Sequence, residues 1–216
     1  MPISVHVLHQ FLNLFFPEPC VFCGKQAIAD AMALCVTCGA MVPDRATRRT
    51  MDGSIQEWFA LGEYAGPIGA SIRRAKYRPD LFVMEGIAKR LAFSVEKLDF
   101  DVVVPVASAP SRLFRRGFNP ALVLAKSLAF QFDKPFRNVL KRVDPVSQSL
   151  KTNRQRRCAV NRFEIFRPVP AVSILLVDDV RTTGSTLREC AELLCSAGAT
   201  RVKAIVAAST SVEKKY

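Results

Sequence analysis

An α/β fold with a parallel sheet flanked by helices is what the sequence predicts, together with a small cysteine-rich segment in front of it. Two short apolar runs, residues 101–106 and 173–177, have the pattern of strands buried on both faces of a parallel sheet. A polar loop and then a helical pattern follow each run, which is the repeating order of a doubly wound domain. The cysteine-rich segment contains four of the seven cysteines, arranged in two pairs.

The composition is that of a folded protein with anionic partners. The chain has 216 residues, of which half are hydrophobic, so it can bury a core and is not a disordered chain. Its net charge of +12 favours phosphorylated or polyanionic partners. Cys158, Cys190 and Cys195 are scattered, which is typical of small core residues in a reducing compartment. We therefore expect a cytoplasmic protein.

The first apolar stretch, residues 3–16, predicts a helix that docks on the body of the protein. It is shorter than the roughly 20 residues that a membrane-spanning helix needs. It also has neither a basic start nor a small-residue cleavage site. We therefore expect no membrane span and no signal peptide, and attachment to a membrane surface is the less favoured interpretation.

The paired cysteines have the spacing of a small zinc ribbon or knuckle. Cys20 and Cys23 form one C-x-x-C pair, Cys35 and Cys38 form the other, and eleven residues separate the pairs. Four thiolates close a tetrahedral shell, so the predicted site is a structural Zn²⁺ site and not a catalytic one. Redox chemistry by one pair alone is disfavoured, because the two pairs come together. Lys25 is the only basic residue between them, which favours a scaffold over a grip on nucleic acid.

Residues 43–54 are polar and predict a linker between two units. The first unit, residues 1–50, is expected to hold the apolar helix and the four-cysteine zinc-binding segment. The second unit, residues 55–216, is expected to be the α/β domain.

The start of the second unit predicts a strand over residues 57–64 and helices over residues 68–77 and 81–98. The first of these helices carries a basic cluster, for which a solvated face is as good an interpretation as a binding site. The cluster consists of Arg73, Arg74, Lys76 and Arg78.

A basic loop, residues 107–118, follows the first buried strand and contains Arg115 and Arg116. Asn119 and Pro120 then begin a helix, because proline is favoured in the first helical turn. An open α/β sheet binds its ligand beyond the carboxyl ends of its strands, so positive charge here predicts an anion site. The alternative is a basic surface loop.

Two carboxylates and a hydroxyl-rich turn follow the second buried strand. Asp178 and Asp179 end the strand, and their oxygens can accept hydrogen bonds from a diol such as a ribose. The hydroxyls of the turn, with the free N–H groups of the helix that follows, can bind a phosphate. The combination predicts a sugar phosphate; the alternative is an ordinary helix cap after an acidic turn. The turn consists of Thr182, Thr183, Gly184, Ser185 and Thr186.

The segment LLVDDVRTTGST resembles the PRPP-binding motif of the type I phosphoribosyltransferases. The resemblance implies that Asp178 and Asp179 hold the ribose hydroxyls and that residues 182–186 hold the 5′-phosphate. The four-cysteine segment, VPV in the first buried strand and RRGFN before a helix extend the resemblance over nearly the whole chain. Together, these segments resemble the ComF family, in which a zinc-binding segment precedes a type I phosphoribosyltransferase-like domain.

This resemblance implies a pyrophosphate loop, Mg²⁺ that accompanies PRPP, and arginines that contact the leaving pyrophosphate. Candidates for that catalytic contact are Arg115, Arg116 and, in a basic lid-like loop over residues 151–162, Arg157. The sequence departs from the family pattern where Pro120 replaces a glutamine, which bears on catalysis more than on PRPP binding. VPVA also stands where the family has VPVP. The pyrophosphate loop consists of Val106, Ala107 and Ser108.

Two functions are compatible with the resemblance. The first is a protein that binds PRPP or a related ribose phosphate or nucleotide, as a phosphoribosyltransferase, with a role in DNA uptake during natural transformation. The second is a non-catalytic accessory of DNA uptake that binds single-stranded DNA or a helicase partner.

Overall fold

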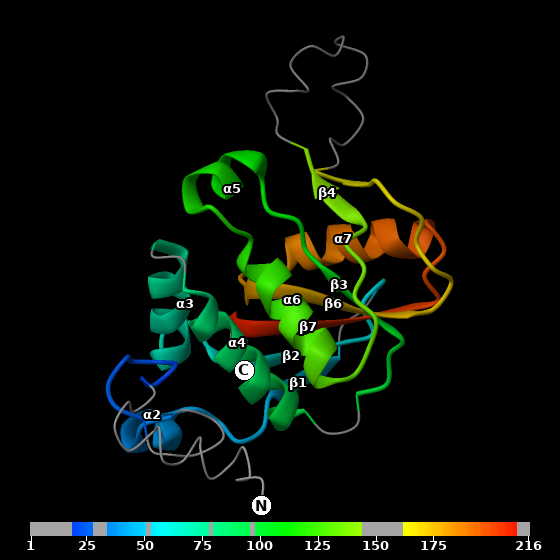
Figure 1. Ribbon diagram of the computed structural model, residues 1–216. Helices are drawn as coiled ribbons and strands as arrows, with labels where there is room; N and C mark the ends of the chain where they lie inside the picture. The colour runs from blue at the N-terminus through cyan, green and yellow to red at the C-terminus, as the bar shows by residue number, and fades with distance from the viewer. Residues whose placement is uncertain are drawn as a thin grey trace, which may run out of the picture.

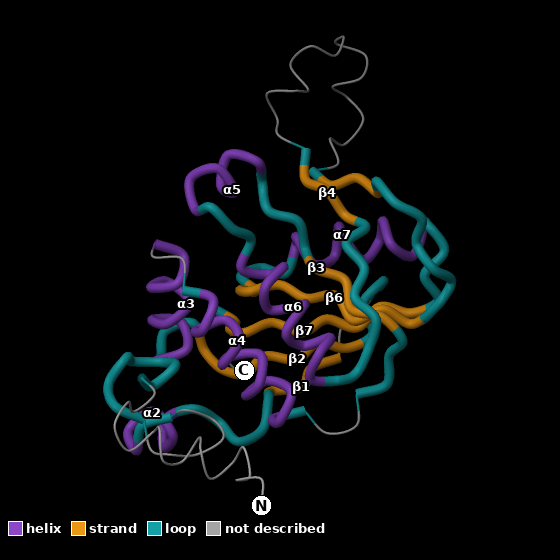
Figure 2. The backbone as a smooth tube through the Cα atoms, viewed as in Figure 1, coloured by secondary structure: helices purple, strands orange, loops and turns teal. Residues whose placement is uncertain are grey.

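The computed structural model describes residues 19–27, 34–50, 53–77, 80–95, 98–143 and 162–210. Their centre is a five-stranded sheet in the order β1-β2-β7-β6-β3 (Figures 1 and 2). Strands β2, β7, β6 and β3 are parallel, and β1 is antiparallel at the edge, which confirms the predicted α/β class. The strands are β1 (Thr47–Thr50), β2 (Glu57–Glu63), β3 (Val102–Pro105), β6 (Ser173–Arg181) and β7 (Arg201–Ser209).

Helices cover both faces of this sheet, because alternate residues of each buried strand point to opposite faces. Val103 and Leu175 pack against α3 (Pro67–Tyr77), α4 (Leu81–Ser94) and α6 (Pro120–Gln131). Val104 and Leu176 pack on the other face, against α7 (Ser185–Ser196) and the separate antiparallel pair β4 (Leu140–Arg142) and β5 (Phe163–Ile165). The strands are therefore buried on both sides, as their continuous apolar runs predict.

Local signals place several helix starts. Asn119 caps α6, since its Oδ1 atom accepts a hydrogen bond from the Ala121 N–H group at 3.1 Å, and Pro120 is the first helical residue. Asp80 caps α4 in the same way, through the N–H group of Val83 at 3.2 Å. The predicted helix start at Asn119 is therefore confirmed.

Two elements differ from the sequence predictions. Thr47–Thr50 form β1 inside the expected linker, and because every residue of this edge strand is exposed, it carries no apolar alternation. Pro110–Arg116 form the short helix α5, none of whose residues is buried, where a basic loop is expected. The last strand, β7, lies in the middle of the sheet, between β2 and β6. The division into residues 1–50 and 55–216 stays a prediction.

The cysteine-rich segment shares one hydrophobic core with α4 and the sheet. Cys20, Val21 and Phe22 are buried in the same cluster as Met84 and residues of α3. Gly86 of α4 makes this contact possible, because a Cβ atom there would lie only 2.4 Å from Cγ2 of Val21. The short helix α2 (Val36–Met41) is capped by Cys35 and contains Cys38, and Figure 1 shows it next to the segment of the first cysteine pair.

Within the described residues, no helix has both the length and the apolar character needed to cross a membrane. The apolar stretch of residues 3–16, Cys158 and the lid-like loop with Arg157 lie outside the described residues.

Candidate functional site

A pocket of about 370 Å³ lies at the carboxyl edge of the parallel sheet, where the ends of β3 and β6 meet. The N–H group of Val106 donates to the carbonyl of Val177 at 2.8 Å, which holds these two strand ends side by side. The pocket is lined by Tyr64, Lys76, Val106, Ala107, Ser108, Arg112, Arg116, Pro120, Arg142, Asp178, Asp179, Val180, Thr182 and Thr186.

The two neighbouring carboxyl groups that line the pocket have pKa values shifted in opposite directions. Burial, followed by the charge of Asp179, raises the pKa of Asp178 well above its ordinary value. Burial also acts to raise the pKa of Asp179, but the ammonium of Lys76 forms an ion pair with it, and the net effect is a lowered pKa. The pair therefore offers an ionised carboxylate next to one that is readily protonated, and together they can accept from and donate to a diol.

The hydroxyl-rich turn connects the end of β6, which carries the carboxylates, to the start of α7. Gly184 has a φ of 77°, a left-handed conformation that glycine adopts without strain, and α7 begins at the next residue. Thr182 and Thr186 line the pocket, whereas Thr183 and Ser185 are exposed in the turn and hydrogen bond to each other at 3.2 Å. Backbone N–H groups at the start of a helix of this length attract an anion.

Cations from three separate elements line the same pocket, and one of them is paired with Asp179. Arg112 and Arg116 come from α5, Arg142 comes from β4, and Lys76 comes from α3. Burial, with the nearby charges of Arg112 and Arg162, lowers the pKa of Arg142, whose guanidinium lies 5.2 Å from the ring centroid of Phe163. Such a cluster repels itself and is relieved by an anion with several charges.

The loop after β3 is fixed by the asparagine of the RGFN segment. The Nδ2 atom of Asn119 donates to the carbonyl of Val106 at 3.0 Å, and Oγ of Ser108 donates to Oδ1 of Asn119 at 2.8 Å. All three residues of the predicted pyrophosphate loop line the pocket, and so does Pro120, at the position where the ComF pattern has glutamine. Pro120 gives this part of the pocket an apolar surface in place of an amide.

The structure separates the predicted site residues into two groups. Asp178, Asp179, Thr182, Thr186 and Arg116 line one pocket, together with the predicted pyrophosphate loop. The others do not line it: Arg115, Thr183, Gly184 and Ser185. Their roles in PRPP binding and catalysis stay predictions. Lys76 belongs to a basic cluster that the sequence singles out without linking it to the carboxylates. Tyr64 and Arg142 reach the pocket by tertiary packing, and no local pattern marks them.

The four predicted metal ligands come together next to the first cysteine turn, which Arg74 of α3 contacts. The Sγ atoms of Cys20, Cys23, Cys35 and Cys38 all lie within 4.8 Å of one another, and those of Cys23 and Cys35 are 3.6 Å apart. Zn–S bonds of about 2.3 Å in a tetrahedron place sulfurs roughly 3.8 Å apart, so the cluster fits such an ion. A hydrogen bond from the Cys38 N–H group lowers the pKa of Cys35 to about 7, whereas burial raises the pKa values of Cys23 and Cys38. Of these three thiols, Cys35 is therefore the most ready to bind a metal as a thiolate.

The chain is similar to known proteins over most of its length. A family model described as a phosphoribosyl transferase domain matches residues 84–215. Competence protein F of Haemophilus influenzae is 30% identical over 66% of this chain and 68% of its own length. DNA utilization protein YhgH of Salmonella typhimurium is 27% identical over 85% of this chain and 87% of its own.

The family model defines the domain class as that of a phosphoribosyltransferase domain. With the four-cysteine cluster in front of this domain and these relatives, the chain belongs to the ComF family. A solved glutamine PRPP amidotransferase from B. subtilis is 23% identical over 57% of this chain and 25% of that one, with a TM-score of 0.44. The fold assignment rests on the family model and on the sheet order.

Proposed function

We propose that the pocket binds PRPP or a closely related ribose phosphate. The observation that carries the proposal is that one cavity combines a carboxylate pair, a hydroxyl-rich helix start and a wall of cations. Asp178 and Asp179 bind the ribose hydroxyls, and the turn of residues 182–186 binds the 5′-phosphate. The pyrophosphate lies between the loop of residues 106–108 and the arginines Arg112, Arg116 and Arg142.

The chemistry that this arrangement supports is phosphoribosyl transfer. The nucleophile of an acceptor bonds to C1 of the ribose as pyrophosphate leaves with the electron pair of the C1–O bond. Negative charge then grows on the departing oxygen, and Arg112, Arg116 and Arg142 stabilise that charge. Asp178 and Asp179 offer the oxygen ligands that Mg²⁺ prefers, and an ion held there would neutralise part of the pyrophosphate charge. The described residues contribute binding and orientation, both of which lower the barrier by holding the leaving group in place.

The zinc cluster and the relatives complete the proposal. Four closely spaced thiol groups support a structural Zn²⁺ ion with no open coordination position. The names of the relatives, a competence protein and a DNA utilization protein, support a role for this chain in the uptake or use of DNA. The cytoplasmic location stays a prediction.

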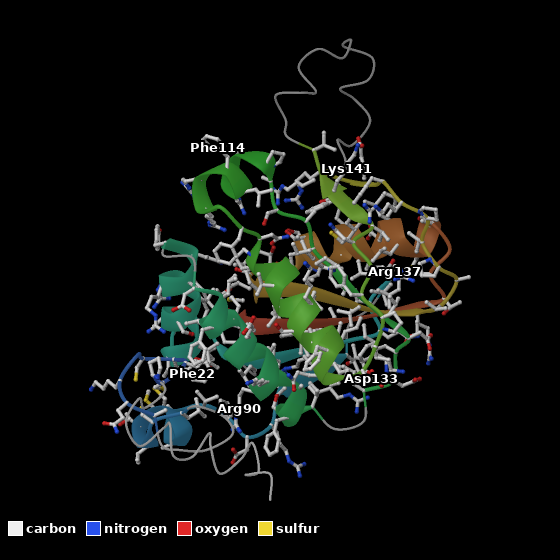
Figure 3. All side chains as sticks on the ribbon, in the orientation of Figure 1. Phe22, Arg90, Phe114, Asp133, Arg137 and Lys141 are labelled. Carbon is white, nitrogen blue, oxygen red and sulfur yellow. The ribbon has the colours of Figure 1, made fainter. Side chains whose placement is uncertain are left out.

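A surface for single-stranded DNA is a second candidate function, and α5 favours it. Phe114 is 96% exposed on a helix that carries three arginines and no acid, and Figure 3 shows it pointing away from the body. Exposed aromatics among arginines stack on bases while the charges contact phosphates. Anisotropy of a labelled single strand tests this: Phe114→Ala should weaken binding about tenfold. The same affinity in the variant would remove α5 from the candidate surface.

The main proposal is tested by isothermal titration of PRPP with Mg²⁺ into the zinc-loaded protein. We expect saturable 1:1 binding, and a loss of about 100-fold or more in the Asp178→Asn, Asp179→Asn double variant. The matched control is Asp99→Asn, which removes an exposed carboxylate at the opposite edge of the sheet. An assay of pyrophosphate release in the presence of candidate acceptors then shows whether bound PRPP is consumed. No binding by a folded, zinc-loaded protein would refute the proposal.

A further inference from the structure

Helix α3 lies between the cysteine cluster and the pocket and contacts both. Its inner face is anchored in the core by Ile68, Ile72 and Ala75, all of which are buried. Figure 3 shows Phe22, from the first cysteine turn, next to this helix. A helix packed in this way moves as one rigid body, so a shift at one of its faces also displaces side chains at the other.

One face of α3 holds the first cysteine turn through Arg74. Its Nη2 atom donates to the carbonyl of Val21 at 3.0 Å, and its Nη1 atom donates to the carbonyl of Phe22 at 3.4 Å. Both carbonyls belong to the two residues between Cys20 and Cys23. The position of the Arg74 guanidinium is therefore set by the turn that presents two of the four thiol groups.

The opposite face of α3 reaches the pocket through Lys76. Residues two apart in a helix point about 200° away from each other, so Arg74 and Lys76 face opposite sides. The Lys76 ammonium forms an ion pair with Oδ2 of Asp179, and both side chains are 16% exposed. A largely buried carboxylate depends on such a partner, because removal of the partner leaves an uncompensated charge.

We propose that Arg74 is a positioning residue of the ligand site, which acts through Lys76 on Asp179 and makes ligand affinity depend on the metal-bound form of the first cysteine turn. The inference rests on the proposed function. When Cys20 and Cys23 share a metal ion, the carbonyls between them are fixed and Arg74 holds α3 in register. Lys76 then keeps Asp179 ionised and oriented toward the ribose. Without the Arg74 contacts, α3 loses its side-chain hydrogen bonds to the first cysteine turn.

The test is a double-mutant cycle on PRPP affinity, measured by titration of zinc-loaded proteins with Mg²⁺. Arg74→Met and Lys76→Met should each weaken binding about tenfold, and the double variant should be no weaker than Lys76→Met alone. Arg74→Lys, which retains a donor for one carbonyl, should recover part of the loss. Additive losses, or unchanged affinity in Arg74→Met, would overturn the inference.

Arg90→Met is the matched control. Arg90 also donates to backbone carbonyls after a cysteine pair, those of Val42 and Pro43, but it lies on α4 and has no contact with the pocket. We expect Arg90→Met to lower thermal stability and to leave PRPP affinity within about twofold of the unmodified protein. An equal loss of affinity in this control would mean that Arg74 acts only through general stability, which contradicts its role as a positioning residue.

A readout without ligand separates this inference from the proposed function. Titration of the ¹³C-labelled carboxyl of Asp179 should show a higher midpoint in zinc-loaded Arg74→Met than in the unmodified protein, and no change in Arg90→Met. An unchanged midpoint in Arg74→Met would overturn the inference even if PRPP binds. Absence of PRPP binding to the unmodified protein would refute the proposed function instead, and the carboxyl titration would still decide the role of Arg74.

Discussion

The cysteine cluster and the ligand pocket are both built on short turns, but they differ in where their polar groups come from. The cluster draws its four thiol groups from nineteen consecutive positions. Backbone N–H groups of the same turns donate to Sγ of Cys35 and to the carbonyls of Cys20, Cys35 and Cys38. The pocket places Asp178 and Asp179 side by side and faces them with cations from α3, α5 and β4. A structural site thus takes its ligands from one short segment, whereas a binding site keeps charges that a ligand must complete.

Removal of a cysteine ligand should give the largest effect. Cys35→Ser should lose the metal and lower the thermal midpoint by more than about 10 °C, because a structural metal contributes folding free energy outright and this segment shares the main core. Zinc content and thermal denaturation measure both effects. Cys195→Ser, a half-buried cysteine of α7, should keep one zinc and melt normally. Full zinc content with normal melting in Cys35→Ser would show that the cluster is not a metal site.

Removal of the Lys76 charge should give the next largest effect. Lys76 helps to lower the pKa of Asp179, so its stabilisation is present above the ordinary carboxyl pKa and is lost as the pH falls through the lowered pKa. Lys76→Met should therefore lower stability at pH 7 by about 2 kcal/mol, or about 4–8 °C in thermal midpoint. The difference should shrink on acidification.

Lys141→Met is the control for this prediction, because Lys141 pairs with Glu164 at the surface, where ion pairs contribute less than about 1 kcal/mol. Thermal melts of both variants between pH 3 and pH 8 make the comparison. A Lys76→Met midpoint equal to that of the unmodified protein at pH 7 would mean that the ion pair does not stabilise the fold.

Two neighbouring arginines of α5 should behave differently. Arg116 lines the pocket, whereas Arg115 is exposed outside it. Arg116→Ala should weaken PRPP binding about tenfold, which corresponds to roughly 1.4 kcal/mol, and Arg115→Ala should change it less than twofold. Titrations at one salt concentration measure the difference. Equal losses would indicate that the positive field of α5 matters more than the position of each guanidinium.

Replacement of Asp178 should have the smallest effect on stability and the opposite sign. The pKa of Asp178 is raised, first by burial and then by Asp179, so the folded state disfavours its charged form and loses stability as the pH rises. Asp178→Asn retains the oxygen that accepts from the Asp179 N–H group at 2.9 Å. It should raise the thermal midpoint at pH 7 by about 2–4 °C, on the order of 1 kcal/mol, while PRPP binding falls. A lower midpoint at pH 7 would contradict this balance.

The sequence predicts those parts of the molecule whose information is local. The C-x-x-C pairs, the buried runs of β3 and β6, and the start of α6 at Asn119 and Pro120 are each encoded within a few residues. The link of Lys76 to Asp179 and the place of Arg142 depend on how α3 and β4 pack, which no local spacing records. The sequence does not predict β1 and α5, because neither element buries an apolar face. Hydrophobic periodicity predicts an element only when one of its faces is buried.

The most direct test of the pocket as a PRPP site compares PRPP with its two halves, ribose 5-phosphate and pyrophosphate, by titration with Mg²⁺. In this account the carboxylates and the turn bind the ribose phosphate, and Arg112, Arg116 and Arg142 bind the pyrophosphate. PRPP should then bind about 100-fold more tightly than either half, because the second contact becomes intramolecular. Pyrophosphate that binds as tightly as PRPP would contradict this account and show a general polyanion site.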